Sequence, residues 1–198
     1  MAANPNDPPR HFYSLDEYFA LEHAGDARYE YWDGDIVCMS GGSRAHGLIS
    51  GNTFYRLRQK LEDSACLAFT ADTAVKTPSL QPYRYPDVSA GCGDLRFENI
   101  RGVDALINPV LIVEALSPTT AQRDAVEKFT AYRAIPTFEE YLLVAQDAPR
   151  ITHHWLQADG QWARDETSDL TATVTLSSVS CVLTAREIYE GVTFRNVS

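Results

Sequence analysis

The sequence has no run of roughly 18 consecutive apolar residues, the shortest stretch that spans a bilayer as a helix, so no transmembrane helix is expected. Its four cysteines form no Cys-x-x-Cys pair, which argues against a zinc knuckle. The absence of a Gly-x-Ser-x-Gly motif argues against an α/β hydrolase. Residues 1–10 contain prolines but no apolar h-region, so we expect a flexible tail rather than a secretory signal. These absences predict a cytoplasmic protein that does not enter a membrane.

Positive charge is also scarce. The chain has 17 basic and 27 acidic residues, which gives a net charge of −10. Because binding to phosphates depends on basic patches, this charge argues against a generic nucleic-acid coat protein. It leaves room for a local basic groove, for which Arg56, Arg58 and Lys60 form the main cluster in the first half of the chain. It also fits a site in which carboxylates gather around a cation.

The remaining composition is that of an ordinary globular protein. Apolar residues make up 44% and charged residues 22% of the 198 residues. Cys38, Cys66, Cys92 and Cys181 lie far apart in the sequence. We expect each of them to pack as a small hydrophobic side chain in a reducing cytoplasm, although the sequence alone leaves a disulfide open. The length suffices for one domain with a full core, so we predict a tail over residues 1–11 and a single α/β domain over residues 12–198.

Local patterns predict the elements of the first half. Ser14-x-x-Glu17 has the spacing of a capping box, which predicts a helix to about residue 23. Asp33-Gly34 between two runs rich in apolar residues is typical of a β-hairpin. In this hairpin Glu30 and Trp32 share one face of the first strand. The remaining predictions are a helix over 46–61 whose face carries His46, Ser50, Phe54, Leu57 and Leu61, strands over 66–75 and 86–90, and an irregular connection over 91–108.

The second half begins with the most apolar stretch, which ends at Glu114 and predicts a strand buried on both faces. Thr119-x-x-Gln122 predicts a helix to about residue 134, and residues 141–145 form another apolar strand. This βαβ pattern predicts parallel pairing and a right-handed crossover. Asp159-Gly160 predicts a further hairpin, and Thr184-x-x-Glu187 predicts a C-terminal helix. The core-facing residues expected on the helix after Glu114 are Ala125, Val126, Phe129 and Tyr132.

Two carboxylates lie at the ends of predicted strands. Asp87 begins one strand after Pro86, and Glu114 ends the buried strand. A charge at the end of an apolar run costs desolvation free energy unless a partner compensates it, and we infer that the partner is a metal ion. Two carboxylates together with water and phosphate oxygens are what Mg²⁺ requires. Lys128 on the following helix would orient the attacking water or stabilise the pentavalent phosphorus. The spacing alone is a weak signal, because strand-end carboxylates are common.

The order of these motifs adds to the signal. They are Pro86-Asp87-Val88-Ser89, the stretch from Leu111 to Thr120, Asp124-x-x-x-Lys128-x-x-x-Tyr132, and Glu140-Tyr141-Leu142-Leu143-Val144. Together they resemble the Uma-two family of putative restriction endonucleases, which belongs to the PD-(D/E)XK nuclease superfamily. The segment from Tyr29 to Met39 and the following His46 also resemble the opening segment of that family. The similarity runs from about Ser14 to Tyr189.

The resemblance implies a restriction-endonuclease-like fold, in which helices flank a central mixed β-sheet and additional β-hairpins are attached. It implies that Asp87 and Glu114 bind metal and that Glu30 supplies an additional N-terminal carboxylate. One position departs from the superfamily motif, because Leu116 stands where that motif has a lysine. The family resembled here takes its lysine from the next helix, which makes Lys128 the candidate.

Each candidate residue also has a structural alternative. Asp87 could cap a turn, and Glu114 could form a salt bridge at the strand end. Lys128 could form an exposed i,i+4 pair with Asp124, which contributes little stability. Glu30 could pair across its hairpin instead of binding metal.

Other polar residues are interpreted as structural. We favour for His46 the interpretation of a histidine bonded on its helix face over a functional role. His153 and His154 are neighbours in a strand, so they point to opposite faces and cannot chelate one ion together. Ser117 lies beside prolines without a Ser-His-Asp context, which argues against a nucleophilic role.

The sequence therefore favours a Mg²⁺-dependent or Mn²⁺-dependent endonuclease that hydrolyses DNA phosphodiester bonds. Asp87 and Glu114 would bind the metal, helped by Glu30 and the Ala115 carbonyl, and Lys128 would position or activate water. By analogy with the superfamily we expect a homodimer. The alternative is a catalytically inactive module that kept the nuclease fold and binds nucleic acid or protein, an interpretation supported by the net charge of −10 and by Leu116.

Overall fold

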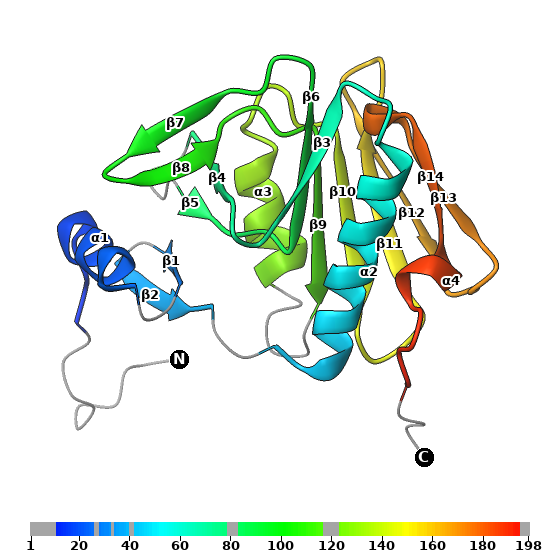
Figure 1. Cartoon of the computed structure of the whole chain (residues 1–198), viewed down its shortest axis with the longest axis horizontal. Coiled ribbons are helices and arrows are strands. Elements are labelled where there is room, and N and C mark those ends of the chain that lie inside the picture. The colour runs from blue at the N-terminus through cyan, green and yellow to red at the C-terminus, as the bar shows by residue number, and fades with distance from the viewer. Residues whose placement is uncertain are drawn as a thin grey trace. The chain divides into compact units, whose positions relative to one another are not determined.

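The computed structural model describes residues 11–25, 28–32, 34–39, 42–78, 83–116 and 123–194, with the backbone alone at positions 100, 123 and 124. The chain forms two compact units, residues 1–40 and 41–198 (Figure 1). The assignment of residues 12–198 to a single domain stays a prediction. None of the helices in the described segments has the length and apolar character that crossing a bilayer requires.

The N-terminal unit contains α1 (Leu15–Ala24), β1 (Tyr29–Trp32) and β2 (Asp35–Cys38). The Ser14 hydroxyl accepts a hydrogen bond from the Glu17 N–H, and the Glu17 carboxylate accepts one from the Ser14 N–H, so the predicted capping box is confirmed. β1 and β2 pair antiparallel, which confirms the predicted hairpin. Glu30 and Trp32 lie on the buried face of β1, as their alternation predicts.

A six-stranded mixed sheet forms the centre of the larger unit, in the order β12-β11-β10-β9-β6-β3 (Figure 1). Its strands are β3 (Cys66–Thr70), β6 (Val88–Cys92), β9 (Leu111–Leu116), β10 (Glu140–Ala145), β11 (Ile151–Leu156) and β12 (Trp162–Thr167). β9 and β10 pair in parallel, and the other neighbouring strands pair antiparallel. The predicted parallel pairing and the predicted mixed sheet are both confirmed.

Two clusters of buried side chains cover the two faces of this sheet. The elements on the first face are α2 (Arg44–Lys60), β13 (Thr173–Leu176), the 3₁₀ turn η2 (Ser177–Val179), β14 (Cys181–Thr184) and α4 (Ala185–Ile188). On the second face lie the π-helix η1 (Arg123–Lys128) and α3 (Phe129–Tyr132), as Figure 1 shows. In β9, Leu111 and Val113 point to the first cluster and Ile112 to the second. This double burial explains why β9 is apolar at successive positions.

The helix predicted over 46–61 corresponds to α2, which begins at Arg44 after the N-cap residue Ser43. Its fully buried face carries Ile49, Thr53 and Leu57, so the predicted face was only partly right. The Thr53 hydroxyl donates a hydrogen bond of 2.7 Å to the Ile49 carbonyl, which satisfies a polar group at a core position. Apolar spacing alone does not detect such a position.

A smaller sheet, in the order β5-β4-β8-β7, corrects two predictions. Its strands are β4 (Ala74–Lys76), β5 (Tyr83–Arg84), β7 (Phe97–Ile100) and β8 (Val103–Leu106). The strand predicted over 66–75 is divided by a turn into β3 and β4, which belong to different sheets. The connection predicted as irregular contains the β7–β8 hairpin, whose turn has positive φ at Arg101 (50°) and Gly102 (88°). An Arg-Gly turn is a weaker hairpin signal than Asn-Gly or Asp-Gly.

The segment after β9 winds differently from the prediction. Residues 117–122, which include Ser117 and the predicted capping box, lie outside the described residues. The π-helix η1 places more residues in each turn than an α-helix does, and this rotates the following side chains about the helix axis. Val126 is consequently 59% exposed, so its predicted core position was wrong, whereas Tyr132 is fully buried. Lys128 is buried instead.

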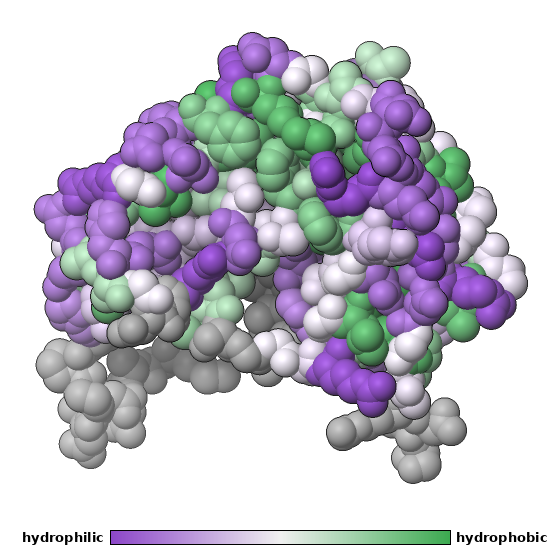
Figure 2. Space-filling view, in the orientation of Figure 1, coloured by the Kyte–Doolittle hydropathy of each residue, from purple (hydrophilic) through white to green (hydrophobic). Residues whose placement is uncertain are grey.

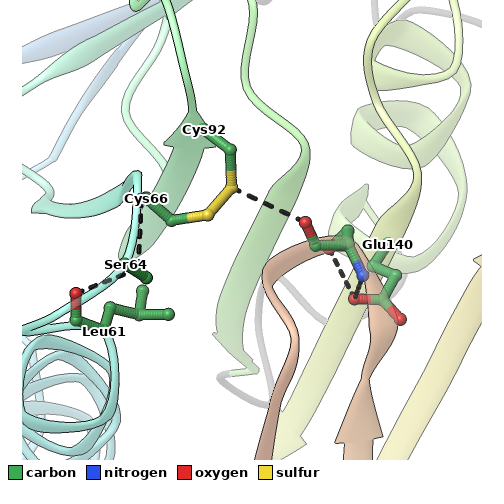
Figure 3. Close-up of a disulfide and its surroundings, with 6 residues drawn as sticks. Leu61, Ser64, Cys66, Cys92 and Glu140 are labelled. Atoms are coloured by element: carbon green, nitrogen blue, oxygen red, sulfur yellow. Dashed lines mark hydrogen bonds between the residues drawn. A yellow bond between two sulfur atoms is a disulfide. The ribbon is translucent and has the colours of Figure 1, made fainter.

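Two of the cysteines form a disulfide, so their predicted state as unpaired hydrophobic side chains was wrong. Cys66 on β3 and Cys92 on β6 are directly opposite in the strand register and are bonded (Figure 3). Their separation of 26 residues hides this pairing in the sequence. The Cys92 sulfur lies 3.6 Å from the Ser178 carbonyl oxygen, a contact without a shared proton because a disulfide sulfur carries none. Cys38 and Cys181 are not part of a disulfide.

Two predictions near the C-terminus are confirmed. β11 and β12 form the predicted hairpin, and Gly160 in its turn has a φ of 81°. The capping box between Thr184 and Glu187 opens α4. This helix is a single turn, which is shorter than a typical globular helix.

Candidate active site

Asp87 and Glu114 lie at the same end of two neighbouring strands. Val88 on β6 is opposite Val113 on β9, so the next step of this antiparallel register brings Asp87 opposite Glu114. The Asp87 Oδ2 atom accepts a hydrogen bond of 2.7 Å from the Ala115 N–H. The Asp87 side chain is 12% exposed and that of Glu114 is 4% exposed. The fold therefore brings together the two carboxylates that the sequence singled out.

Glu114 is held from the second face of the sheet. The Lys128 Nζ and Tyr132 Oη atoms each donate a hydrogen bond of 3.1 Å to Glu114 Oε1. Lys128 ends η1 and Tyr132 ends α3, so one turn of helix supplies both donors. Lys128 therefore points toward the carboxylate rather than away from it.

The structural alternative for Lys128 was wrong. Its side chain is 4% exposed, so it does not form an exposed surface pair. The side chain of Asp124 lies outside the described residues. Leu116, at the motif position of the lysine, is the last residue of β9 and packs against the second core cluster. The positive charge near Glu114 comes from the helix.

Tyr132 was assigned to the core from its helical spacing. The ring does lie in the second core cluster with no exposed surface, but its hydroxyl reaches Glu114. A buried tyrosine normally finds a partner for its hydroxyl, and its position four residues after Lys128 was the available signal.

Asp87 is also held from the first face of the sheet. The His46 Nε2 atom lies 2.9 Å from Asp87 Oδ1. His46 is thus a satisfied histidine on its helix face, and its partner is a carboxylate of the candidate site, so a functional role for it stays a prediction. The sequence offered only the residue type and its position in the first turn of a helix.

The sequence analysis did not predict that Gln146 contributes to the candidate site. It follows β10, and its Nε2 donates a hydrogen bond of 3.1 Å to the Ala115 carbonyl, while the Ser43 Oγ lies 2.5 Å from its Oε1. A signal existed, because β9 and β10 are parallel and residues at the carboxyl ends of parallel strands meet at one edge of a sheet.

Glu30 belongs to the N-terminal unit. Its side chain is buried and accepts a hydrogen bond of 3.1 Å from the Trp32 Nε1. Its neighbour in the register of the hairpin is Val37. A role for Glu30 beside Asp87 and Glu114 stays a prediction.

The donor atoms around Asp87 and Glu114 suit a hard cation. Two carboxylates and the Ala115 carbonyl are oxygen ligands, which Mg²⁺ prefers. Each oxygen of Asp87 accepts one hydrogen bond, from His46 or Ala115, and a carboxylate oxygen has a second lone pair for a cation. Among the described residues no three His, Cys, Asp or Glu side chains form a metal-binding group. An ion here would complete its coordination with water, as Mg²⁺ commonly does.

His153 and His154 point to opposite faces of the sheet, as predicted. His153 contacts Glu140 and Trp155, whereas His154 contacts Phe129 and Tyr141. A cavity of about 500 Å³ lies beside His153 and Glu140, between β10–β12 and β13. Neither Asp87 nor Glu114 lines it, so this cavity is separate from the candidate site.

Comparisons with known proteins show the family and the fold of this chain. Residues 15–185 match the model of the Uma2 family, described as "Putative restriction endonuclease". An uncharacterised protein of Synechocystis sp., slr1290, is 30% identical over 196 residues, which cover 98% of this chain and 100% of that protein. A second Synechocystis protein, sll1609, is 31% identical over 150 residues, which cover 76% of this chain and 84% of that protein.

A solved structure shows the same fold. The crystal structure of a putative nuclease belonging to DUF820 from Anabaena variabilis superposes with a TM-score of 0.71 over 91% of this chain and 99% of that one. The sequence identity is 17%, so this likeness concerns the fold, which is restriction-endonuclease-like as predicted. Since the family model covers most of the chain and the slr1290 match spans both proteins, the chain belongs to the Uma2 family of putative restriction endonucleases.

Proposed function

We propose that this chain is a divalent-metal-dependent endonuclease that hydrolyses DNA phosphodiester bonds. The observation that carries the proposal is the meeting of Asp87, Glu114 and the Lys128 ammonium group at one end of β6 and β9. Family membership supports it. The buried Glu114, paired with Lys128, and the mostly buried Asp87 cost desolvation free energy, and such an arrangement is typical of functional sites.

Asp87, Glu114 and the Ala115 carbonyl would hold Mg²⁺ or Mn²⁺. When bound, such an ion supplies a polarised water and neutralises charge on the phosphate. Hydrolysis forms a bond from the water oxygen to phosphorus and breaks one bridging P–O bond, while the water gives up a proton and the leaving oxygen takes one up. Lys128, held by Glu114, donates hydrogen bonds to the attacking water or to a phosphate oxygen.

Cleavage of plasmid and single-stranded DNA in Mg²⁺ or Mn²⁺ tests the proposal. We expect Asp87→Asn and Glu114→Gln to lower the rate by about a hundredfold or more, because each removes a charge that binds the ion. Asp159→Asn is the matched control, since this exposed carboxylate lies in the β11–β12 turn. A parallel assay on single-stranded RNA separates DNA from RNA as substrate. Intact DNA with the wild-type protein, or equal cleavage by Asp87→Asn, would refute the proposal.

The second candidate is a module that binds nucleic acid or protein without hydrolysis. One observation favours it: Lys128 and Tyr132 both donate to the same oxygen of Glu114, so this buried carboxylate has protein partners without an ion. Thermal unfolding with Mg²⁺ or Mn²⁺ distinguishes the two candidates. The endonuclease should gain stability from the ion through Asp87 and Glu114, whereas the inactive module should gain none.

A further inference from the structure

The start of α2 is linked to two of the groups that would hold the metal, the Asp87 carboxylate and the Ala115 carbonyl. Ser43 is the N-cap residue, and its Oγ accepts a hydrogen bond of 3.1 Å from the His46 N–H. This bond satisfies one of the free N–H groups at the helix start and fixes Ser43 and His46 relative to each other. The two side chains leave this turn toward different residues of the site.

The His46 side chain reaches Asp87. Its Nε2 lies 2.9 Å from Oδ1, while the Ala115 N–H bonds to Oδ2 at 2.7 Å. The carboxylate is therefore held at both oxygens by groups from two separate elements, α2 and β9. Rotation of the Asp87 carboxylate would break one of these two bonds.

The Ser43 side chain reaches the Ala115 carbonyl through Gln146. Its hydroxyl lies 2.5 Å from Gln146 Oε1, and Gln146 Nε2 donates 3.1 Å to the Ala115 carbonyl oxygen. Because a serine hydroxyl can donate to Oε1, it decides which end of the amide faces Ala115. The bonds close a ring through Ser43, His46, Asp87, Ala115 and Gln146.

We propose that His46 and Ser43 are positioning residues, which hold the Asp87 carboxylate and the Ala115 carbonyl in the orientation that binds the divalent ion. The inference rests on the proposed function, in which these groups bind the metal. His46 acts as a hydrogen-bond donor to Asp87 and not as a ligand. Partners of this kind fix the orientation of metal ligands, and their loss typically weakens metal affinity by about tenfold to a hundredfold.

Titration calorimetry of the full chain with Mn²⁺ tests the inference without relying on activity. His46→Ala removes the donor and should weaken Mn²⁺ binding about tenfold or more. His46→Gln places an amide N–H near the position of Nε2, so binding should stay within about threefold of the wild type. Ser43→Gly keeps most of the capping, because glycine is well tolerated at an N-cap, but it removes the hydroxyl that orients Gln146. It should weaken binding by about threefold to tenfold. Ser50→Ala, one turn further along α2, is the matched control.

The calorimetry results can overturn the positioning role of His46 in two ways. Wild-type affinity in His46→Ala overturns the inference, because the ring then does not position Asp87. Equal weakening in His46→Gln and His46→Ala also overturns it, since a ligand rather than a donor has then been removed. If the wild type binds no Mn²⁺, or Asp87→Asn binds it equally well, the proposed function fails and the inference fails with it. Thermal unfolding without metal shows whether each variant is folded.

Discussion

At the scale of single residues, the ion pair between Lys128 and Glu114 is almost completely shielded from water, with 4% of each side chain exposed. The sequence indicated both residues, because one ends an apolar run and the other follows on the next helix. It did not indicate the hydrogen bond of the Tyr132 hydroxyl, since Tyr132 was assigned to the core, and it did not indicate Gln146. Their partners lie on β9, to which the packing of α3 brings Tyr132 and the parallel register of β10 brings Gln146.

Lys128→Met should destabilise the protein by about 3 kcal/mol, because it leaves the Glu114 carboxylate buried without its charged partner. The double variant Lys128→Met with Glu114→Gln should recover part of this loss, since the uncompensated charge is then gone. Urea unfolding measures both values. Lys76→Met is the control, because its partner Glu98 is 44% exposed and such a pair contributes at most about 1 kcal/mol. A loss as small as that of the control would contradict the buried network.

At the scale of elements, the sequence predicted the strands that are buried on both faces and the capped helices. It did not predict the π-helical winding of η1, which follows from tertiary packing rather than from residue spacing. Nor did it predict the β7–β8 hairpin or the connection of η2 to the central sheet. The latter depends on Glu140, whose carboxylate accepts hydrogen bonds from the Ser177 N–H and the Ser178 hydroxyl.

Glu140 makes the stability of this connection depend on pH. Burial by itself raises the pKa of the Glu140 carboxyl, but the neighbouring His153 ring and hydrogen bonds from Ser178 and Ser177 outweigh burial and hold the pKa below its ordinary value of 4.5. The unfolded chain therefore binds this proton more tightly than the folded one. Ionised Glu140 stabilises the fold above pH 4.5, and this stabilisation is lost as the pH falls below 4.5.

Glu140→Gln should accordingly lower the free energy of unfolding at pH 7, and the difference from the wild type should shrink as the pH falls below the ordinary carboxyl pKa. Urea unfolding at several pH values between neutral and acid measures this. Glu166→Gln is a suitable comparison, because this carboxylate is 39% exposed. A difference that stays constant across the pH range would show that Glu140 contributes through packing alone.

The disulfide between Cys66 and Cys92 joins the edge strand β3 to β6, the strand that Asp87 precedes. Figure 3 shows it close to the η2 turn that Glu140 holds. Under denaturing conditions without reductant, thiol titration should detect Cys38 and Cys181, and reduction should raise the number to all four cysteines. Reduction should also destabilise the fold by about 3 kcal/mol, the value expected for a loop of this size. Four reactive thiols before reduction would show that the bond does not form in solution.

At the scale of the whole molecule, the net charge of −10 limits how DNA can bind. The basic cluster expected on α2 is offset, because Arg56 pairs with Glu190 at 2.7 Å and Lys60 pairs with Glu187 at 3.2 Å. Figure 2 shows hydrophilic residues spread over the side of the larger unit that carries α2. The net charge predicted that the protein has little positive charge for DNA binding. It did not predict that Glu187 and Glu190, from the C-terminal segment, pair with the basic residues of α2. The expected homodimer stays a prediction.

If Asp87 and Glu114 meet the phosphate through a divalent ion, DNA binding should depend on that ion. Without it, two carboxylates and an acidic protein repel the phosphates. We expect Ca²⁺, which substitutes for Mg²⁺ with looser geometry, to tighten binding of a fluorescent DNA duplex by about tenfold relative to EDTA. Fluorescence anisotropy at constant ionic strength measures this, and Asp87→Asn should abolish the gain while Asp159→Asn keeps it. If the protein binds the DNA duplex with equal affinity in Ca²⁺ and in EDTA, then DNA binds away from Asp87 and Glu114. The two carboxylates would in that case not bind the phosphate through an ion.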